Sequence, residues 1–138
     1  MNPRKPTLWF FIFSIVGFGI GYVLTNSVKF GICVYDGLRR DPACLNFYER
    51  IGDPIFFGMG ALVLVSFVLL FVPKAVKAWS KFAVWSVPLV ALMFVLYPTP
   101  GGTDYFTPDP ETAFKWLSGF YAVLSLIIIG FVSLRKKN

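Results

Sequence analysis

The sequence predicts an all-α membrane protein, a bundle of four transmembrane helices. The first observation is composition: 57% of the 138 residues are hydrophobic, 14% are charged, and the mean hydropathy is +0.69. So small a chain could not bury that much apolar surface in one water-soluble core. The second observation is that the apolar residues form four long runs, and the third is that charged residues collect between them. Lipid is therefore the expected surrounding of most of the chain.

Four apolar runs have lengths suited to crossing a bilayer. A helix needs about 20 apolar residues to cross a hydrocarbon core of about 30 Å. The third run is short, but residues 75–81 can extend it, because the stems of Lys77 and Lys81 can reach back to the headgroups. We treat residues 1–138 as a single four-span domain. The predicted spans are residues 8–28, 54–72, 82–97 and 113–134, and the predicted outer loops are residues 29–53 and 98–112.

The charges predict which way the chain crosses the membrane. One set of segments has eight basic residues and no acidic one: Arg4, Lys5, Lys74, Lys77, Lys81, Arg135, Lys136 and Lys137. The other set, the two outer loops with Lys115, has five basic residues and all seven acidic ones, a net charge of −2. Since loops rich in Lys and Arg stay on the cytoplasmic side, both termini are predicted to be cytoplasmic. The expected location is a plasma (inner) membrane.

Three Asp-Pro pairs mark expected helix starts. An aspartate at the N-cap accepts a hydrogen bond from a free backbone N–H, and proline suits the first helical position because it has no N–H to satisfy. We therefore predict that Asp41, Asp53 and Asp109 cap helices, the last two at the starts of the second and fourth spans. Residues 45–51 predict a separate short amphipathic helix on the membrane surface. Paired carboxylates for catalysis are the alternative interpretation of these aspartates.

The two cysteines, Cys33 and Cys44, both lie in the first outer loop. Disulfides persist outside the cytoplasm, and closing a loop of about 12 residues contributes roughly 3 kcal/mol in the chain-entropy model. We predict a structural disulfide between them. A redox-active pair and two free thiols are the alternatives.

The topology and the cysteine pair resemble two families. Four spans with cysteines in an outer loop resemble the quinone-linked thiol oxidases, which relay electrons through two cysteine pairs, one of them C-x-x-C. This chain has one widely spaced pair, so a second dithiol for the relay is missing. The pair in the first outer loop also resembles the claudin-like tetraspan proteins, whose longer loop has a tryptophan motif before the first cysteine; here only residues 30–32 separate Lys29 from Cys33. We assign the chain to neither family.

Glycines in the first span predict close helix packing. Gly17 and Gly21 form a small-xxx-small pair, and backbones can approach closely at such residues. The expected contact is with another helix of the same bundle. The alternative is contact with a membrane-protein partner or with a second copy of the chain through the first span.

The sequence contains few groups suited to catalysis. There is no histidine, which removes the usual general base and the commonest ligand of transition metals. The first three spans contain no charged residue, which argues against a pump or an ion-coupled carrier. We predict no catalytic, cofactor-binding or metal-binding residues, no cofactor, and no nucleic-acid partner, with the lipid bilayer as the main partner.

The expected function is therefore that of a small, non-enzymatic accessory or scaffold subunit that acts through helix packing. The first alternative is a thiol oxidoreductase, linked to quinone, that uses the cysteine pair. The second is a channel or carrier for a neutral or lipid-like molecule.

Overall fold

The computed structural model describes residues 4–35, 39–97 and 109–135. Within these ranges four helices are long and apolar enough to cross a membrane, as the sequence predicts. They are α1 (Arg4–Thr25), α2 (Pro42–Phe71), α3 (Val76–Leu96) and α4 (Pro110–Arg135). The prediction of an all-α, four-helix membrane protein is confirmed.

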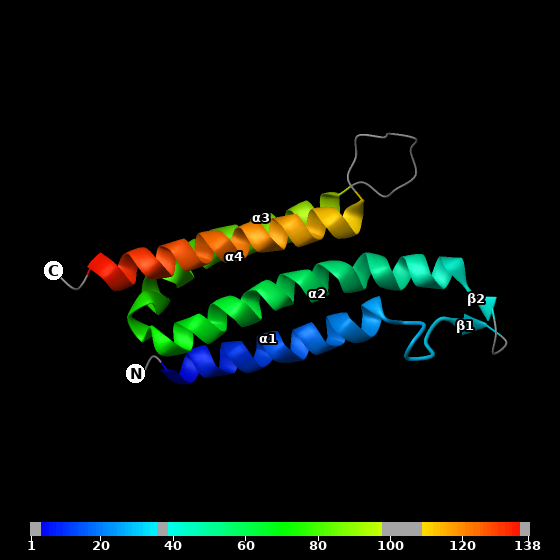
Figure 1. Cartoon of the computed structure of the whole chain (residues 1–138), viewed down its shortest axis with the longest axis horizontal. Helices are drawn as coiled ribbons and strands as arrows, with labels where there is room; N and C mark the ends of the chain where they lie inside the picture. Colours follow the sequence, from blue (N-terminus) through cyan, green and yellow to red (C-terminus); the bar gives the residue numbers. More distant parts are fainter. Residues whose placement is uncertain (1–3, 36–38, 98–108, 136–138) are drawn as a thin grey trace.

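The four helices run antiparallel to their neighbours in sequence (Figure 1). Arg4, Arg135 and the short 3₁₀ helix η1 (Pro73–Ala75) lie at one end of the bundle, which we call the terminal end. We call the opposite end the disulfide end. Helix α1 packs against α2, and α3 packs against α4, so the bundle consists of two helical hairpins. The main contact between the two hairpins is that of α2 with α4.

Three of the four predicted spans match observed helices to within a few residues. The first span begins earlier, at Arg4, and ends at Thr25, after which the chain continues in turns. The third span extends toward η1 and begins at Val76, as the lysine stems allow. The fourth begins at Pro110, directly after Asp109, whose carbonyl accepts a hydrogen bond from the N–H of Ala113 (3.0 Å).

The prediction for the start of the second span is wrong. Helix α2 begins at Pro42 and continues without a break through Asp53 and Pro54. Asp53 therefore does not cap a helix, and residues 45–51 form the first turns of α2 and not a separate surface helix. Proline inside a helix removes only one backbone hydrogen bond, and the rest of α2 maintains the helix across that gap.

Helix α2 begins instead at the first Asp-Pro pair. The Asp41 carboxylate accepts hydrogen bonds from the N–H groups of Ala43 (3.0 Å) and Cys44 (3.4 Å), and Pro42 is the first helical residue. Just before it, β1 (Val34–Tyr35) pairs antiparallel with β2 (Arg39–Arg40). This two-stranded pair lies between the turns after α1 and the start of α2.

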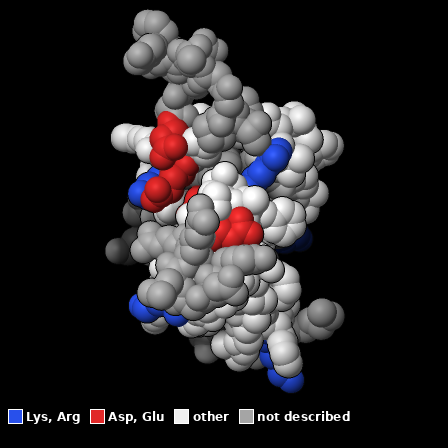
Figure 2. All heavy atoms as spheres, turned by 90° about the vertical axis from the view of Figure 1, so that its right-hand side faces the viewer, with Lys and Arg blue, Asp and Glu red and all other residues white. Residues whose placement is uncertain are grey.

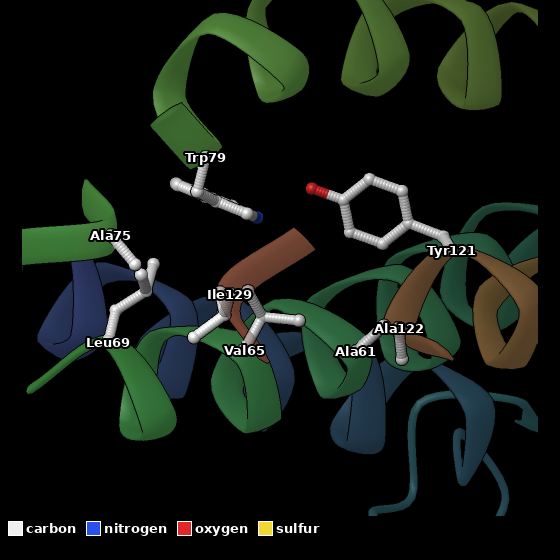
Figure 3. Packing of buried hydrophobic residues seen from close by; sticks show 8 residues of the cluster. All are labelled: Ala61, Val65, Leu69, Ala75, Trp79, Tyr121, Ala122 and Ile129. Atoms are coloured by element: carbon white, nitrogen blue, oxygen red, sulfur yellow. The ribbon is translucent and has the colours of Figure 1, made fainter. Parts of the chain in front are cut away.

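The hydrophobic core lies toward the terminal end, where all parts of the bundle meet (Figure 3). Helix α2 contributes Val65 and Leu69, which are almost completely buried. The ring of Phe10 on α1 meets the ring of Trp79 on α3 edge to face, with centroids 5.5 Å apart. The buried cluster consists of Ala61, Val65, Leu69, Ala75, Trp79, Tyr121, Ala122 and Ile129.

The two helices of the first hairpin approach closely at glycines. A Cβ atom on Gly17 would lie 2.9 Å from the side chain of Met59, and one on Gly21 would lie 2.6 Å from the backbone of Phe56. Gly52 on α2 meets the backbone of Thr25 in the same way, at 2.7 Å. Both glycines singled out by the sequence therefore lie in contact with α2.

Candidate ligand-binding cavity

A cavity of about 290 Å³ lies between α2, α3 and α4. This volume is close to the lower end of the range typical of small-molecule sites. Apolar side chains from α2 and α3 form most of its wall, and α4 adds Ser118 and Tyr121. The lining residues are Pro54, Ile55, Gly58, Met59, Ala61, Leu62, Val87, Val90, Ala91, Phe94, Val95, Ser118 and Tyr121.

The Ser118 hydroxyl differs from the hydroxyls of Ser14, Ser66 and Ser86, which are bonded within their own helices, and is like those of Ser27 and Ser125, which are not. Serines inside helices usually donate to the carbonyl one turn earlier. Ser14 donates to Phe10 (2.9 Å), Ser66 to Leu62 (2.6 Å) and Ser86 to Phe82 (2.8 Å). The Ser118 side chain is 5% exposed, yet its hydroxyl makes no hydrogen bond to any residue that the structure describes.

Tyr121 lies one turn further along the same face of α4. Its ring stacks on Phe82 with centroids 6.0 Å apart, and its hydroxyl points toward Trp79 (Figure 3). Ser86 and Ser125 lie near the Tyr121 hydroxyl, but the hydroxyl makes no hydrogen bond of normal geometry with described residues. A buried polar group without a hydrogen bond costs free energy, because its bonds to water are lost and not replaced.

The disulfide end contains a second, polar cavity of about 570 Å³, which we call the mouth. Its wall includes four carboxylates, from Glu49, Asp53, Asp109 and Glu111, and one guanidinium, from Arg50. Figure 2 views this end and shows described Asp and Glu side chains grouped there, with Lys and Arg near them. The mouth therefore disfavours anions.

Two charged residues beside the mouth are fixed by direct contacts. Lys115 forms an ion pair with Glu111 at 2.7 Å, one turn apart on α4. The same ammonium group lies 5.5 Å from the centre of the Phe57 ring on α2. Lys115 thus joins the two hairpins near the disulfide end through a cation–π contact.

Phe94 lies at the boundary between the two cavities, since it lines both. Its ring meets Phe114 of α4 edge to face, with centroids 5.0 Å apart. The polar mouth and the apolar cavity are therefore adjacent, with an aromatic pair at their junction.

The cysteines lie outside both cavities. Cys33 and Cys44 form a disulfide bond, as predicted, with Cα atoms 5.7 Å apart. Cys33 is almost completely buried. The bond ties the segment after α1 to the first turn of α2.

The sequence located little of this site. Of the predicted site residues, only Asp53 and Asp109 line the mouth, and none lines the apolar cavity. Ser118 and Tyr121, which line the apolar cavity, were not among the predicted site residues, although their spacing of three residues places them on one face of α4. Among the described residues no group of three or more Cys, Asp or Glu side chains is arranged to hold a metal ion.

Comparisons with models of known families, with curated proteins and with solved structures found no match to this chain.

Proposed function

We propose that the protein binds a neutral, lipid-like molecule in the cavity between α2, α3 and α4, and acts as a carrier or binding protein for it. The observation that carries this proposal is the buried hydroxyl of Ser118, which makes no hydrogen bond to the described residues, in a wall that is apolar apart from Ser118 and Tyr121. Ligand sites typically combine an apolar lining with a few polar groups that orient the ligand. The accessory or scaffold role expected from the sequence stays a prediction.

The chemistry of the wall defines the ligand class. Apolar side chains cannot compensate a charge removed from water, so the buried part of the ligand is uncharged. A hydroxyl can donate or accept one hydrogen bond with the ligand. A long-chain alcohol, ketone or ester meets both conditions, and the four carboxylates of the mouth disfavour an anionic one.

We also propose that the protein sits in a plasma membrane with both termini cytoplasmic. The support is the charge of +8 on the segments of the terminal end against −2 on the others. The mouth would then open to the outer side.

The binding proposal is tested by photolabelling in lipid nanodiscs with a hexadecanol that has a diazirine on its chain. Mass spectrometry locates the labelled residues. We expect saturable labelling of cavity residues such as Val90 and Ser118. Val87→Phe, which places a larger ring in the cavity wall, lowers that labelling about tenfold.

Val84→Phe is the matched control. It makes the same change on the same helix, but Val84 is 68% exposed on the outer surface of the bundle. Labelling of the cavity residues should be unchanged in this variant. Equal labelling in the wild type and in both variants would overturn the proposal, because the probe would then report only the surrounding lipid.

A further inference from the structure

Two buried polar atoms belong to Trp79 and Tyr121, which lie in the same hydrophobic cluster. In Figure 3 the indole nitrogen of Trp79 on α3 and the hydroxyl of Tyr121 on α4 point toward one another. The two side chains are 6% and 5% exposed. Neither polar atom makes a hydrogen bond of normal geometry to the part of the chain that the structure describes, although Ser86 and Ser125 lie near the Tyr121 hydroxyl.

The chemistry of these atoms restricts what can satisfy them. The indole N–H can only donate, so the partner of Trp79 must be an acceptor. The Ser86 hydroxyl, which lies near Tyr121, donates to the Phe82 carbonyl (2.8 Å). Ser125, completely buried beside Tyr121, is also without a hydrogen bond among the described residues. The indole N–H of Trp79 thus lies in an apolar core beside the hydroxyls of Tyr121 and Ser125, which can donate as well as accept.

We propose that Trp79 and Tyr121 form a binding site for one oxygen atom that accepts hydrogen bonds from both. An oxygen with two lone pairs can accept hydrogen bonds from the Trp79 N–H and the Tyr121 O–H at once. Ser125 lies near the Tyr121 hydroxyl and can orient it. The oxygen belongs either to a carbonyl of a lipid-like molecule or to a buried water molecule. This site goes beyond the function proposed for the cavity, and either proposal can fail alone.

The experiment uses the full chain in nanodiscs with ¹³C-carbonyl 2-decanone as the probe and n-decane as the competitor without oxygen. Infrared spectroscopy follows the carbonyl band, which moves to lower frequency when the oxygen accepts hydrogen bonds. In parallel, resonance Raman spectroscopy follows the indole N–H in a protein whose only tryptophan is Trp79. The other three tryptophans, Trp9, Trp85 and Trp116, are 73–82% exposed and are replaced by Phe.

A saturable, shifted carbonyl band that falls about threefold to tenfold in Tyr121→Phe supports the site with a ligand carbonyl. Trp79→Phe should lower the shifted carbonyl band by a similar factor. If Trp79→Phe does not fold, Tyr121→Phe, which removes only one oxygen atom, tests the site by itself. If 2-decanone gives no shifted band, a Trp79 N–H that stays hydrogen-bonded in Tyr121→Phe, Ser86→Ala and Ser125→Ala supports a site that holds water, and loss of that bond in either serine variant overturns the inference.

Two other results also overturn the inference. The first is the absence of a shifted carbonyl band together with an indole N–H that is hydrogen-bonded in the wild type and free in Tyr121→Phe. Trp79 would then donate directly to the Tyr121 hydroxyl. The other is an N–H that is free in every sample. Photolabelling of the cavity by the diazirine alcohol is independent of both results, so the cavity function is judged separately.

Discussion

The backbone of Phe56 on α2 lies so close to Gly21 on α1 that a Cβ atom there would be 2.6 Å from the Phe56 nitrogen and 2.7 Å from its Cα. A backbone cannot yield as the tip of a flexible side chain can. Association of helices in lipid depends on such close packing, because the hydrophobic effect adds little between them. The Gly21–Phe56 approach therefore fixes the geometry of the first hairpin.

Gly21→Ala is predicted to destabilise the protein by about 1–3 kcal/mol, the usual cost of overpacking. Gly19→Ala is the control, since a Cβ atom at Gly19 meets nothing within 4 Å. Thermal melting in detergent, combined with light scattering, measures both effects. A Gly21→Ala variant that melts like the wild type but changes oligomeric size would show instead that this face meets another chain.

Cys33→Ser is predicted to lower the free energy of unfolding by roughly 3 kcal/mol, the chain-entropy contribution of a loop of this length. The bond is also predicted to stay oxidised in glutathione buffers down to about −300 mV, as structural disulfides do. A redox titration of the purified protein provides the measurement. A potential near about −200 mV would favour the thiol oxidoreductase alternative.

Ser118→Ala is predicted to stabilise the ligand-free protein by about 1 kcal/mol, because it removes a buried hydroxyl that has no partner among the described residues. The same change weakens binding of a long-chain alcohol about threefold to tenfold. Ser66→Ala is the comparison: its hydroxyl donates to Leu62, so no stabilisation is expected. Equal melting temperatures and alcohol affinities in the wild type and in Ser118→Ala would argue that the hydroxyl is satisfied by its own helix.

The predicted orientation is tested with single cysteines at Lys77 and Asn46 in a background that lacks Cys33 and Cys44. A membrane-impermeant maleimide added to intact cells should label position 46 and not position 77, because the basic loop around Lys77 stays inside. Lysed cells provide the control for reactivity. Labelling at 77 with protection at 46 would reverse the orientation.

The sequence predicts the spans well because apolar length and charge are local properties. It fails at the start of α2, where Asp53-Pro54 matches the pattern of a helix start although the helix passes through it. An Asp-Pro pair can stand at the start of a helix or inside one. Here the pair is inside α2, because residues 42–53 already form helical turns before Pro54.

The cavity was not predicted for a different reason. Whether Ser118 bonds to its own helix or faces a gap depends on how α4 sits against α2 and α3, which is a property of tertiary packing. The sequence does place Ser118, Tyr121 and Ser125 on one face of α4, but the same pattern is compatible with ordinary hydroxyls bonded within the helix.

The most direct test of the proposed function is a density map of the full chain purified in native lipid, at a resolution that shows side chains. We predict elongated density between Val87 and Ser118, with one end within hydrogen-bond distance of the Ser118 hydroxyl. A map in which the side chains of α2 and α3 close the cavity, and Ser118 donates to the carbonyl of Phe114, would contradict it.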